Sequence, residues 1–125
     1  MTQHHKVFQV DHHEDIAVIT LQPANSGYRY ADVHKESNVV LHLFDQPAHN
    51  HVVVDLSQVD IMSSSMIGVF VRLFRKISNA GGCAAFCSAS ENMTRIVQDM
   101  NLTQIWSIFP TREAAIEAIQ NKITN

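Results

Sequence analysis

The fold is decided by the stretch VVVDLSQVDIMSSSMIG, which spans residues 52–68. Its first part, Val52 to Leu56, is a short run rich in β-branched residues, typical of a strand buried on both faces in a parallel sheet. A serine-rich turn follows, and from Ser64 to about Asn79 apolar residues recur with helical spacing. A buried strand that leads directly into an amphipathic helix is typical of an α/β fold.

Further strands and helices are expected on both sides of this stretch. Before it, two β-rich runs joined by a polar turn predict a hairpin, and the spacing of Val33, Val40 and Phe44 predicts a helix. After it, a Gly-Gly pair ends the helix, and strands again alternate with helices. The expected elements are strands 7–10 and 16–21 around the turn 12–15, helix 31–45, strand 52–56, helix 64–79, strand 83–87, a helix capped by Ser88 or Ser90 (Glu91 fits a capping box with Ser88), strand 105–109 and a last helix after Thr111.

The expected architecture is a single small α/β sandwich with the order β-β-α-β-α-β-α-β-α. Strands that alternate with helices need crossover connections onto one sheet, so we expect a mixed, mostly parallel sheet with about four helices. With 125 residues and no linker, repeat or low-complexity tract, the chain is expected to form one domain, residues 1–125, with its core at about 6–121. Functional loops gather at the carboxyl ends of parallel strands, so the loop after Asp55 is the first candidate site.

The composition excludes several classes of function. Nine Lys and Arg against twelve Asp and Glu give a formal charge of −3, which does not favour nucleic acid as a partner. The longest uncharged apolar run, residues 66–71, is far shorter than the ~20 residues that span a bilayer. The first residues lead into no apolar segment typical of a secretory signal. We therefore expect a cytoplasmic protein that does not insert into membranes.

Ser64 is expected at the polar edge of the helix that follows the turn. At 100° per residue from Ser64, Gly68 lies at about 40°, Arg72 at about 80° and Arg75 at about 20°, with Lys76 at about 120°. The apolar residues fall at about 140–340°. A serine in a first helical turn is most often an N-cap, but a phosphate there would also meet free backbone N–H groups and the positive end of the helix dipole. The pattern alone leaves capping and phosphorylation both open.

Residues 52–68 resemble the characteristic motif of the STAS domain, the family of anti-sigma-factor antagonists. In that family a buried strand ends in Asp-Leu and is followed by a turn of the type aromatic-Met-Asp-Ser-Ser-Gly-Leu-Gly and a helix. The resemblance extends from about Asp15 to Gln120. It includes the Gly81-Gly82 turn, the Met-Asn-Leu helix exit at 100–102 and the Ile-Phe-Pro-Thr run at 108–111, which leads into a Glu- and Ala-rich helix.

The resemblance implies a signalling domain in transcription regulation rather than an enzyme. Such an antagonist binds an anti-sigma factor that is also a serine kinase; the kinase phosphorylates the serine after the Asp of the turn, and a serine phosphatase reverses the modification. Here that serine corresponds to Ser64, with Ser63 and Ser65 as the alternative acceptors. The implied partner-binding residues are Asp60, Met62, Ser63, Ser64, Ser65, Met66 and Gly68.

The chain departs from the family pattern at two positions of this turn. Ser63 occupies the position of the Asp, which removes a carboxylate next to the phosphoacceptor and leaves a hydroxyl that could itself cap the helix. Met66 occupies the position of the Gly after the two serines, and its place on the helix directs it inward or toward the rim of an interface. Both departures bear on recognition by a kinase.

An accessory role in a transport or lipid-trafficking complex is the alternative to this function. Some domains that resemble the family serve as accessory subunits of transport or lipid-trafficking complexes, without phosphorylation. A serine hydrolase is not favoured, because its strained elbow needs Gly-x-Ser-x-Gly and Ser64 has Met62 and Met66 at those positions.

Histidines occur in three close pairs, His4-His5, His12-His13 and His49-Asn-His51. Adjacent histidines on a strand point to opposite faces, and no spacing matches a closed zinc site. We therefore interpret them as solvated turn residues and expect no metal and no cofactor.

Overall fold

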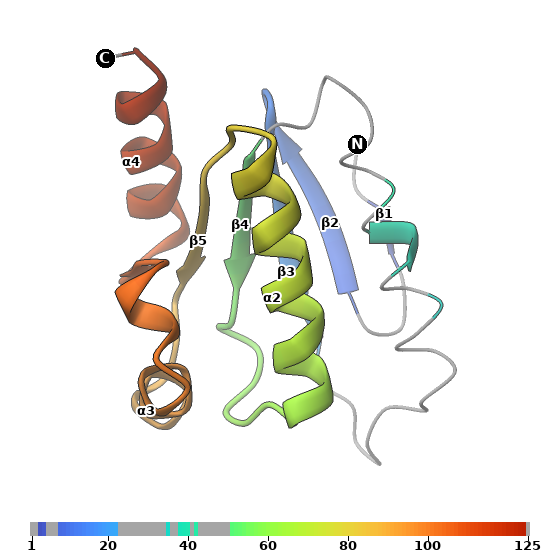
Figure 1. Cartoon of the computed structure of the whole chain (residues 1–125), viewed down its shortest axis with the longest axis vertical. Coiled ribbons are helices and arrows are strands. Elements are labelled where there is room, and N and C mark those ends of the chain that lie inside the picture. The colour runs from blue at the N-terminus through green and yellow to red at the C-terminus, as the bar shows by residue number, and fades with distance from the viewer. Residues whose placement is uncertain are drawn as a thin grey trace.

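The computed structural model describes residues 3–4, 8–22, 35, 38–40, 42 and 51–124. Within these residues strands and helices alternate after a β-rich beginning (Figure 1). The strands are β1 (Gln3–His4), β2 (Phe8–His13), β3 (Ile16–Leu21), β4 (His51–Asp55), β5 (Ala84–Cys87) and β6 (Ile108–Phe109). The helices are α2 (Ser64–Asn79), α3 (Glu91–Asp99), the 3-10 helix η1 (Leu102–Gln104) and α4 (Arg112–Thr124).

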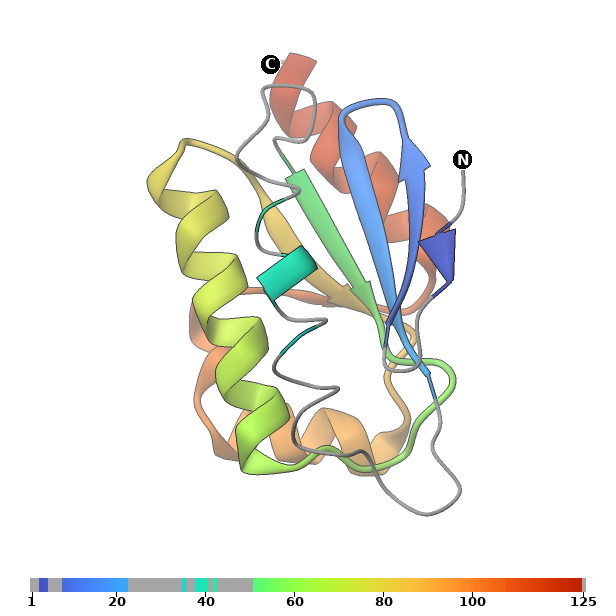
Figure 2. The same cartoon turned by 90° about the vertical axis from the view of Figure 1, so that its right-hand side faces the viewer.

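The six described strands form one sheet in the order β1-β2-β3-β4-β5-β6. β1, β2 and β3 pair antiparallel, whereas β3, β4, β5 and β6 run parallel. The sheet lies between α2 on one face and α4 on the other, and α3 lies near the start of α2 (Figure 2). This mixed, mostly parallel sheet between helices confirms the predicted α/β architecture.

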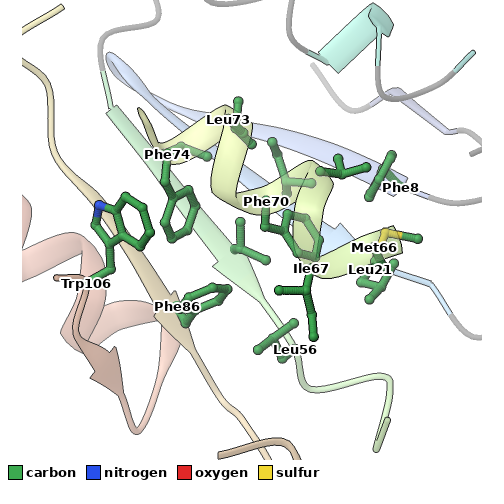
Figure 3. Close-up of a cluster of buried hydrophobic side chains, with 14 of the residues drawn as sticks. Phe8, Leu21, Leu56, Met66, Ile67, Phe70, Leu73, Phe74, Phe86 and Trp106 are labelled. Atoms are coloured by element: carbon green, nitrogen blue, oxygen red, sulfur yellow. The ribbon is translucent and has the colours of Figure 1, made fainter. Parts of the chain in front are cut away.

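The larger part of the core lies between the sheet and α2. Phe74 packs between two aromatic rings, with centroids 4.8 Å from Phe86 and 5.1 Å from Trp106 (Figure 3). Phe70 makes an edge-on contact with Phe86, at 6.3 Å between the ring centroids. The buried side of α2 is the one that the helical spacing predicts: Met66, Ile67, Val69, Phe70, Leu73, Phe74 and Ile77 are each 5% exposed or less.

A second, smaller cluster lies between the sheet and α4. It consists of Ile16, Val18, Val53, Cys87, Ala115 and Ile119. Val52 and Val54 belong to the α2-side cluster and Val53 to the α4-side cluster, because successive strand residues point to opposite faces. β4 is therefore buried on both faces, as its continuous apolar run predicts.

The amino-terminal hairpin differs from its prediction in the length of its turn. β2 continues to His13 and pairs with Ile16, so the turn is Glu14-Asp15 rather than residues 12–15. Glu14 adopts a left-handed conformation with φ 57°, which a two-residue hairpin turn requires because it matches the twist of the strands. The short strand β1 beside β2 was not predicted.

The predicted strand 105–109 is wrong over its first half. Only Ile108 and Phe109 are in β6, and a 3-10 helix precedes them. The backbone N–H of Trp106 donates to the carbonyl of Leu102 at 2.8 Å, and both side chains are buried in the α2-side core. Their i, i+4 spacing favours a helical turn, which leaves the intervening Ile105 68% exposed.

Two further predictions concern helix starts and the region before β4. α3 is capped by Ser90, whose Oγ accepts from the N–H of Met93 at 3.0 Å, and Ser88 has φ 59°, so the predicted capping box of Ser88 with Glu91 does not form. Of the predicted helix 31–45, the described residues Lys35, 38–40 and His42 are helical, and the rest of that range lies outside the described residues.

Candidate functional site

The loop of residues 56–63 connects the carboxyl end of β4 to α2, where the topology predicts a site. Its first residues are fixed to the sheet: the N–H of Leu56 donates to the carbonyl of Cys87 at 3.0 Å, and the N–H of Ser57 donates to Asp55 Oδ1 at 2.8 Å. Its middle is fixed to α3, since Asn92 Nδ2 donates to the carbonyl of Asp60 at 2.8 Å. The loop is thus held between β4 and the first turn of α3.

The last residue of this loop caps α2. Ser63 is extended, with φ −72° and ψ 160°, and its Oγ accepts from the backbone N–H of Met66 at 3.2 Å. This bond satisfies one of the N–H groups that a helix start leaves without an intrahelical acceptor. Ser63 therefore acts as the N-cap at the position where the STAS motif has Asp, a residue type that caps helices equally well. Ser64 is consequently the first residue of α2.

The predicted partner-binding residues separate into exposed and buried positions. Asp60, Ser63 and Gly68 are exposed, and Met62 is half-buried against the α2-side core. Met66 is 2% exposed, so of the two orientations predicted for it the inward one is observed.

The remaining two predicted residues, Ser64 and Ser65, form the start of α2. Both are helical, and their side chains lie outside the described part of the structure. Ser64 follows the capping residue Ser63 directly and is the first residue of α2, where the helix was predicted to begin.

Ile61 is a surface residue that the sequence analysis missed. It is 72% exposed, the most exposed of the large apolar residues in the described part of the chain. It lies between Asp60, whose carbonyl is bonded to Asn92, and the half-buried Met62. A single apolar residue in a polar turn produces no periodic pattern, and only its departure from turn composition could have indicated it.

A polar cluster supports the base of the loop from the α4 side of the sheet. Arg112, in the first turn of α4, donates through Nε and Nη2 to Asp55 Oδ2 at 3.2 and 2.9 Å. Nη2 also donates to Thr20 Oγ1 at 3.1 Å, and Nη1 lies 3.5 Å from Asp11 Oδ2. One guanidinium therefore joins the ends of β3 and β4 to β2, and Asp55 links this cluster to the loop through Ser57.

This cluster shifts the ionisation of its members. Burial acts to raise the pKa of Asp55, but hydrogen bonds from Ser57 and Arg112 outweigh it and hold the pKa below its ordinary value. Burial, with a contribution from the nearby Asp55 charge, raises the pKa of the Cys87 thiol to about 11. Asp55 is thus a carboxylate and Cys87 a neutral thiol at physiological pH, and the cluster is built for support rather than for nucleophilic chemistry.

His51 is not the solvated turn residue that the sequence predicts. It is 7% exposed at the start of β4, and its Nδ1 accepts from the backbone N–H of Cys83 at 2.9 Å, while Nε2 lies 3.5 Å from Asp15 Oδ2. The imidazole therefore joins the starts of β4 and β5 to the β2–β3 turn.

Across the described ranges no three His, Cys, Asp or Glu side chains converge as a candidate metal site, and no helix is long and apolar enough to cross a membrane.

Comparisons with known proteins agree with this geometry. A family model, described as the STAS domain, matches residues 8–115. A protein of Thermotoga maritima described as a candidate anti-sigma factor antagonist is 30% identical over 105 residues, which cover 84% of this chain and 92% of that protein. The structure of an anti-sigma-factor antagonist (STAS) domain protein from Planctomyces limnophilus is similar with a TM-score of 0.77 at 25% identity, covering 90% of this chain and 97% of that one.

Two solved forms of one further protein share the fold. The anti-sigma factor antagonist SpoIIAA in its unphosphorylated form has a TM-score of 0.77 at 19% identity and covers 91% of this chain and 96% of that one. The phosphorylated form of SpoIIAA, from Bacillus, has a TM-score of 0.72 at 20% identity and covers 90% of this chain and 98% of that one.

Proposed function

This chain belongs to the STAS domain family, and from that premise we propose that it is a non-catalytic anti-sigma-factor antagonist of the cytoplasm. Its partner is an anti-sigma factor that is also a serine kinase, so that binding regulates transcription. The kinase phosphorylates Ser64, which releases the partner, and a serine phosphatase restores the unmodified form.

The observation that carries this proposal is the position of Ser64 directly after the N-cap. The Ser63 hydroxyl accepts from the N–H of Met66, which supports Ser64 rather than Ser63 as the phosphate acceptor.

The loop before Ser64 is held by Asp55 and Asn92 and presents the exposed Ile61. A partner can therefore contact an ordered loop and the start of α2 together. That SpoIIAA is known in both phosphorylated and unphosphorylated forms is consistent with a switch of this kind in a protein of the same fold.

Phosphorylation at this position changes the surface more than the fold. A phosphate adds about −1.5 to −2 charges at pH 7. Near the first turn of α2 that charge faces the positive end of the helix dipole, so the helix tolerates it. A partner that fits the unmodified surface must then accommodate a solvated dianion. A coupling of about 1–3 kcal/mol, the usual range, would weaken its binding about 5- to 150-fold.

The direct test is to map phosphorylation of the intact protein. The chain is incubated with ATP and a lysate of its source cells, or with the purified kinase, and its mass and modified site are determined. We expect one phosphate on Ser64 that Ser64→Ala abolishes and Ser65→Ala preserves. Modification on Ser63 or Ser65 alone would assign the switch to a neighbouring serine, and stable binding of a transport-complex subunit with no phosphorylation would replace the proposal with an accessory role.

A further inference from the structure

Two positive charges on the exposed face of α2, those of Arg72 and Arg75, pair with no carboxylate in the described part of the chain. Arg72 and Arg75 are both exposed, and within the described part of the chain neither makes an ion pair or a hydrogen bond. The helix, SSMIGVFVRLFRKISN, contains no Asp or Glu, so no carboxylate lies three or four residues away along it. Arg112 differs sharply, since it is bonded to Asp55 and lies near Asp11.

These two positive charges lie on a chain whose formal charge is −3. Surface arginines on helices are commonly paired with carboxylates at i±3 or i±4, which lowers the field that they project. Arg72 and Arg75 form no such pair with a described residue, and both are exposed on the surface of α2. Such a patch attracts an oppositely charged surface and speeds its encounter with the protein.

Gly68 makes the same face accessible to close contact. It is exposed, and a Cβ placed on it would meet nothing within 4 Å, so packing against the described residues does not require glycine there. In a helix interior glycine costs about 0.5–1 kcal/mol relative to alanine. What glycine does offer is backbone that another molecule can approach without a side chain between them.

Gly68, Arg72 and Arg75 together form a strip, which we call the basic strip. By helical geometry they lie within about 60° of one another around α2 and extend about 10 Å along it. The strip begins one turn after Ser64 and so continues directly from the surface proposed above.

We propose that the partner of this protein places an acidic protein surface along the basic strip, with its backbone or a small side chain against Gly68 and its carboxylates near Arg72 and Arg75. This inference rests on the proposed function and adds the chemistry of the partner. It also explains why phosphorylation would weaken binding of the partner rather than strengthen it. An acidic surface seated on the strip is attracted by the two guanidinium groups and repelled by a phosphate on Ser64 at the start of the same helix.

The strip fits an acidic protein better than a lipid surface or a nucleic acid. Membrane-surface helices combine basic residues with exposed apolar ones, and lipid-binding clusters contain roughly four to eight Lys or Arg. The large apolar residues exposed in the described part of the chain, Val39, Ile61, Met100 and Ile105, all lie outside α2. Two exposed arginines on a chain of formal charge −3 also neutralise too few phosphates for strong binding to nucleic acid.

The test compares charge reversals on and off the strip. The full chain is titrated with the purified anti-sigma factor kinase of its source organism, as wild type and as Arg72→Glu, Arg75→Glu and Arg95→Glu. Arg95 on α3 is the control away from the strip, because it too is exposed and makes no ion pair or hydrogen bond in the described part of the chain. It differs from Arg72 and Arg75 in having carboxylates four residues away along its helix, at Glu91 and Asp99. Circular dichroism verifies that each variant is folded, and Arg72→Lys verifies that charge is the cause.

We expect each reversal on the strip to weaken binding about tenfold in about 0.1 M salt and much less in about 0.5 M salt, where screening is stronger. Arg95→Glu and Arg72→Lys should remain within about twofold of wild type. Equal effects of all three reversals, or none, would overturn the inference while leaving the proposed function intact. If wild type itself does not bind the kinase, the proposed function fails, and the inference with it. Binding to phosphatidylserine vesicles or duplex DNA that Arg72→Glu abolishes and Arg95→Glu preserves would reassign the strip and overturn the acidic-protein partner.

Discussion

Arg112 Nη2 lies 2.9 Å from Asp55 Oδ2, which ties the first turn of α4 to the last residue of β4. The other oxygen of the same carboxylate accepts from the N–H of Ser57, the second residue of the loop that ends in Ser63. Support for the loop of residues 56–63 therefore comes through the sheet, from a helix on the face opposite to α2. The contribution of this ion pair to the free energy of unfolding can be measured separately from partner binding.

Removing Arg112 should destabilise the protein more than removing Asp11. Asp55 has a side chain only 7% exposed, so Arg112→Ala leaves a buried carboxylate without its main cation. Because the guanidinium is itself partly exposed, we expect a loss of about 1–3 kcal/mol, below the range for fully buried pairs. Asp11→Asn removes the charge that lies 3.5 Å from Arg112 and keeps an oxygen that can accept from Gln9 Nε2, which donates to Asp11 in the wild type. It should cost less than about 1 kcal/mol. Urea unfolding measures both, and equal losses would contradict the central role given to Asp55.

Asp55 should also make stability depend on acidity. Its pKa in the folded protein is below the ordinary 3.8, so the carboxylate contributes stability above that value and loses it as the pH falls through the folded pKa. Asp55→Asn lacks this contribution. The difference in unfolding free energy between wild type and Asp55→Asn should therefore be constant near neutral pH and shrink below about pH 4. A difference that does not change between about pH 6 and pH 3 would show that this carboxylate is not stabilised in its charged form.

The two thiols should react at different rates. Burial raises the pKa of Cys87 to about 11, and the thiolate is the form that attacks alkylating reagents. Cys83 is only half-buried. In native protein near pH 8 we expect iodoacetamide to modify Cys83 first, and Cys87 only after unfolding in urea, as peptide mapping by mass spectrometry would detect. Modification of Cys87 in the folded state at a comparable rate would show that the strand end opens readily.

Ser63 should stabilise α2 through its cap. Ser63→Ala removes the acceptor of the Met66 N–H and should cost about 1 kcal/mol. Ser63→Asp keeps an acceptor, adds a charge that favours the helix start, and restores the residue type of the STAS motif. We expect it to equal or exceed wild type in thermal stability. If Ser63→Ala has no effect on the unfolding midpoint, the hydrogen bond at this cap contributes nothing measurable.

The parts of the fold that could be predicted are those with a strong local pattern. β4 is apolar at consecutive positions and α2 divides into apolar and polar sides, and both occupy nearly the predicted residues. The strand predicted at residues 105–109 was wrong in its first half, because the apolar composition of this segment fits a strand. Leu102 and Trp106 also have helical spacing, and packing of Trp106 against Phe74 favours the helical turn. Local sequence cannot decide between two such arrangements when the tertiary contact is what separates them.

The position of the candidate loop could be predicted, but the contacts that support it could not. The loop after Asp55 follows from the topology of a parallel sheet, and the cap at Ser63 from its residue type. The bond from Arg112 to Asp55 joins residues 57 apart in the sequence, and the polar bond from Cys83 to the ring of His51 joins residues 32 apart. No periodic pattern in the sequence contains such pairs. The burial of His51 and the support of the loop by Arg112 can therefore be seen only in the folded chain.

Ile61 should contribute to binding and little to stability. A residue 72% exposed loses little packing when it is replaced, whereas at an interface an apolar anchor can account for about 2 kcal/mol. We expect Ile61→Ser to weaken binding of the anti-sigma factor kinase about 10- to 30-fold with an unfolding midpoint close to that of wild type. Ile105→Ser is the matched control, because Ile105 is 68% exposed and lies after η1, away from the serine turn in sequence. Calorimetric titration of both variants measures the comparison, and an equal loss in the two would mean that exposed apolar area, rather than the position of Ile61 in the loop, determines binding.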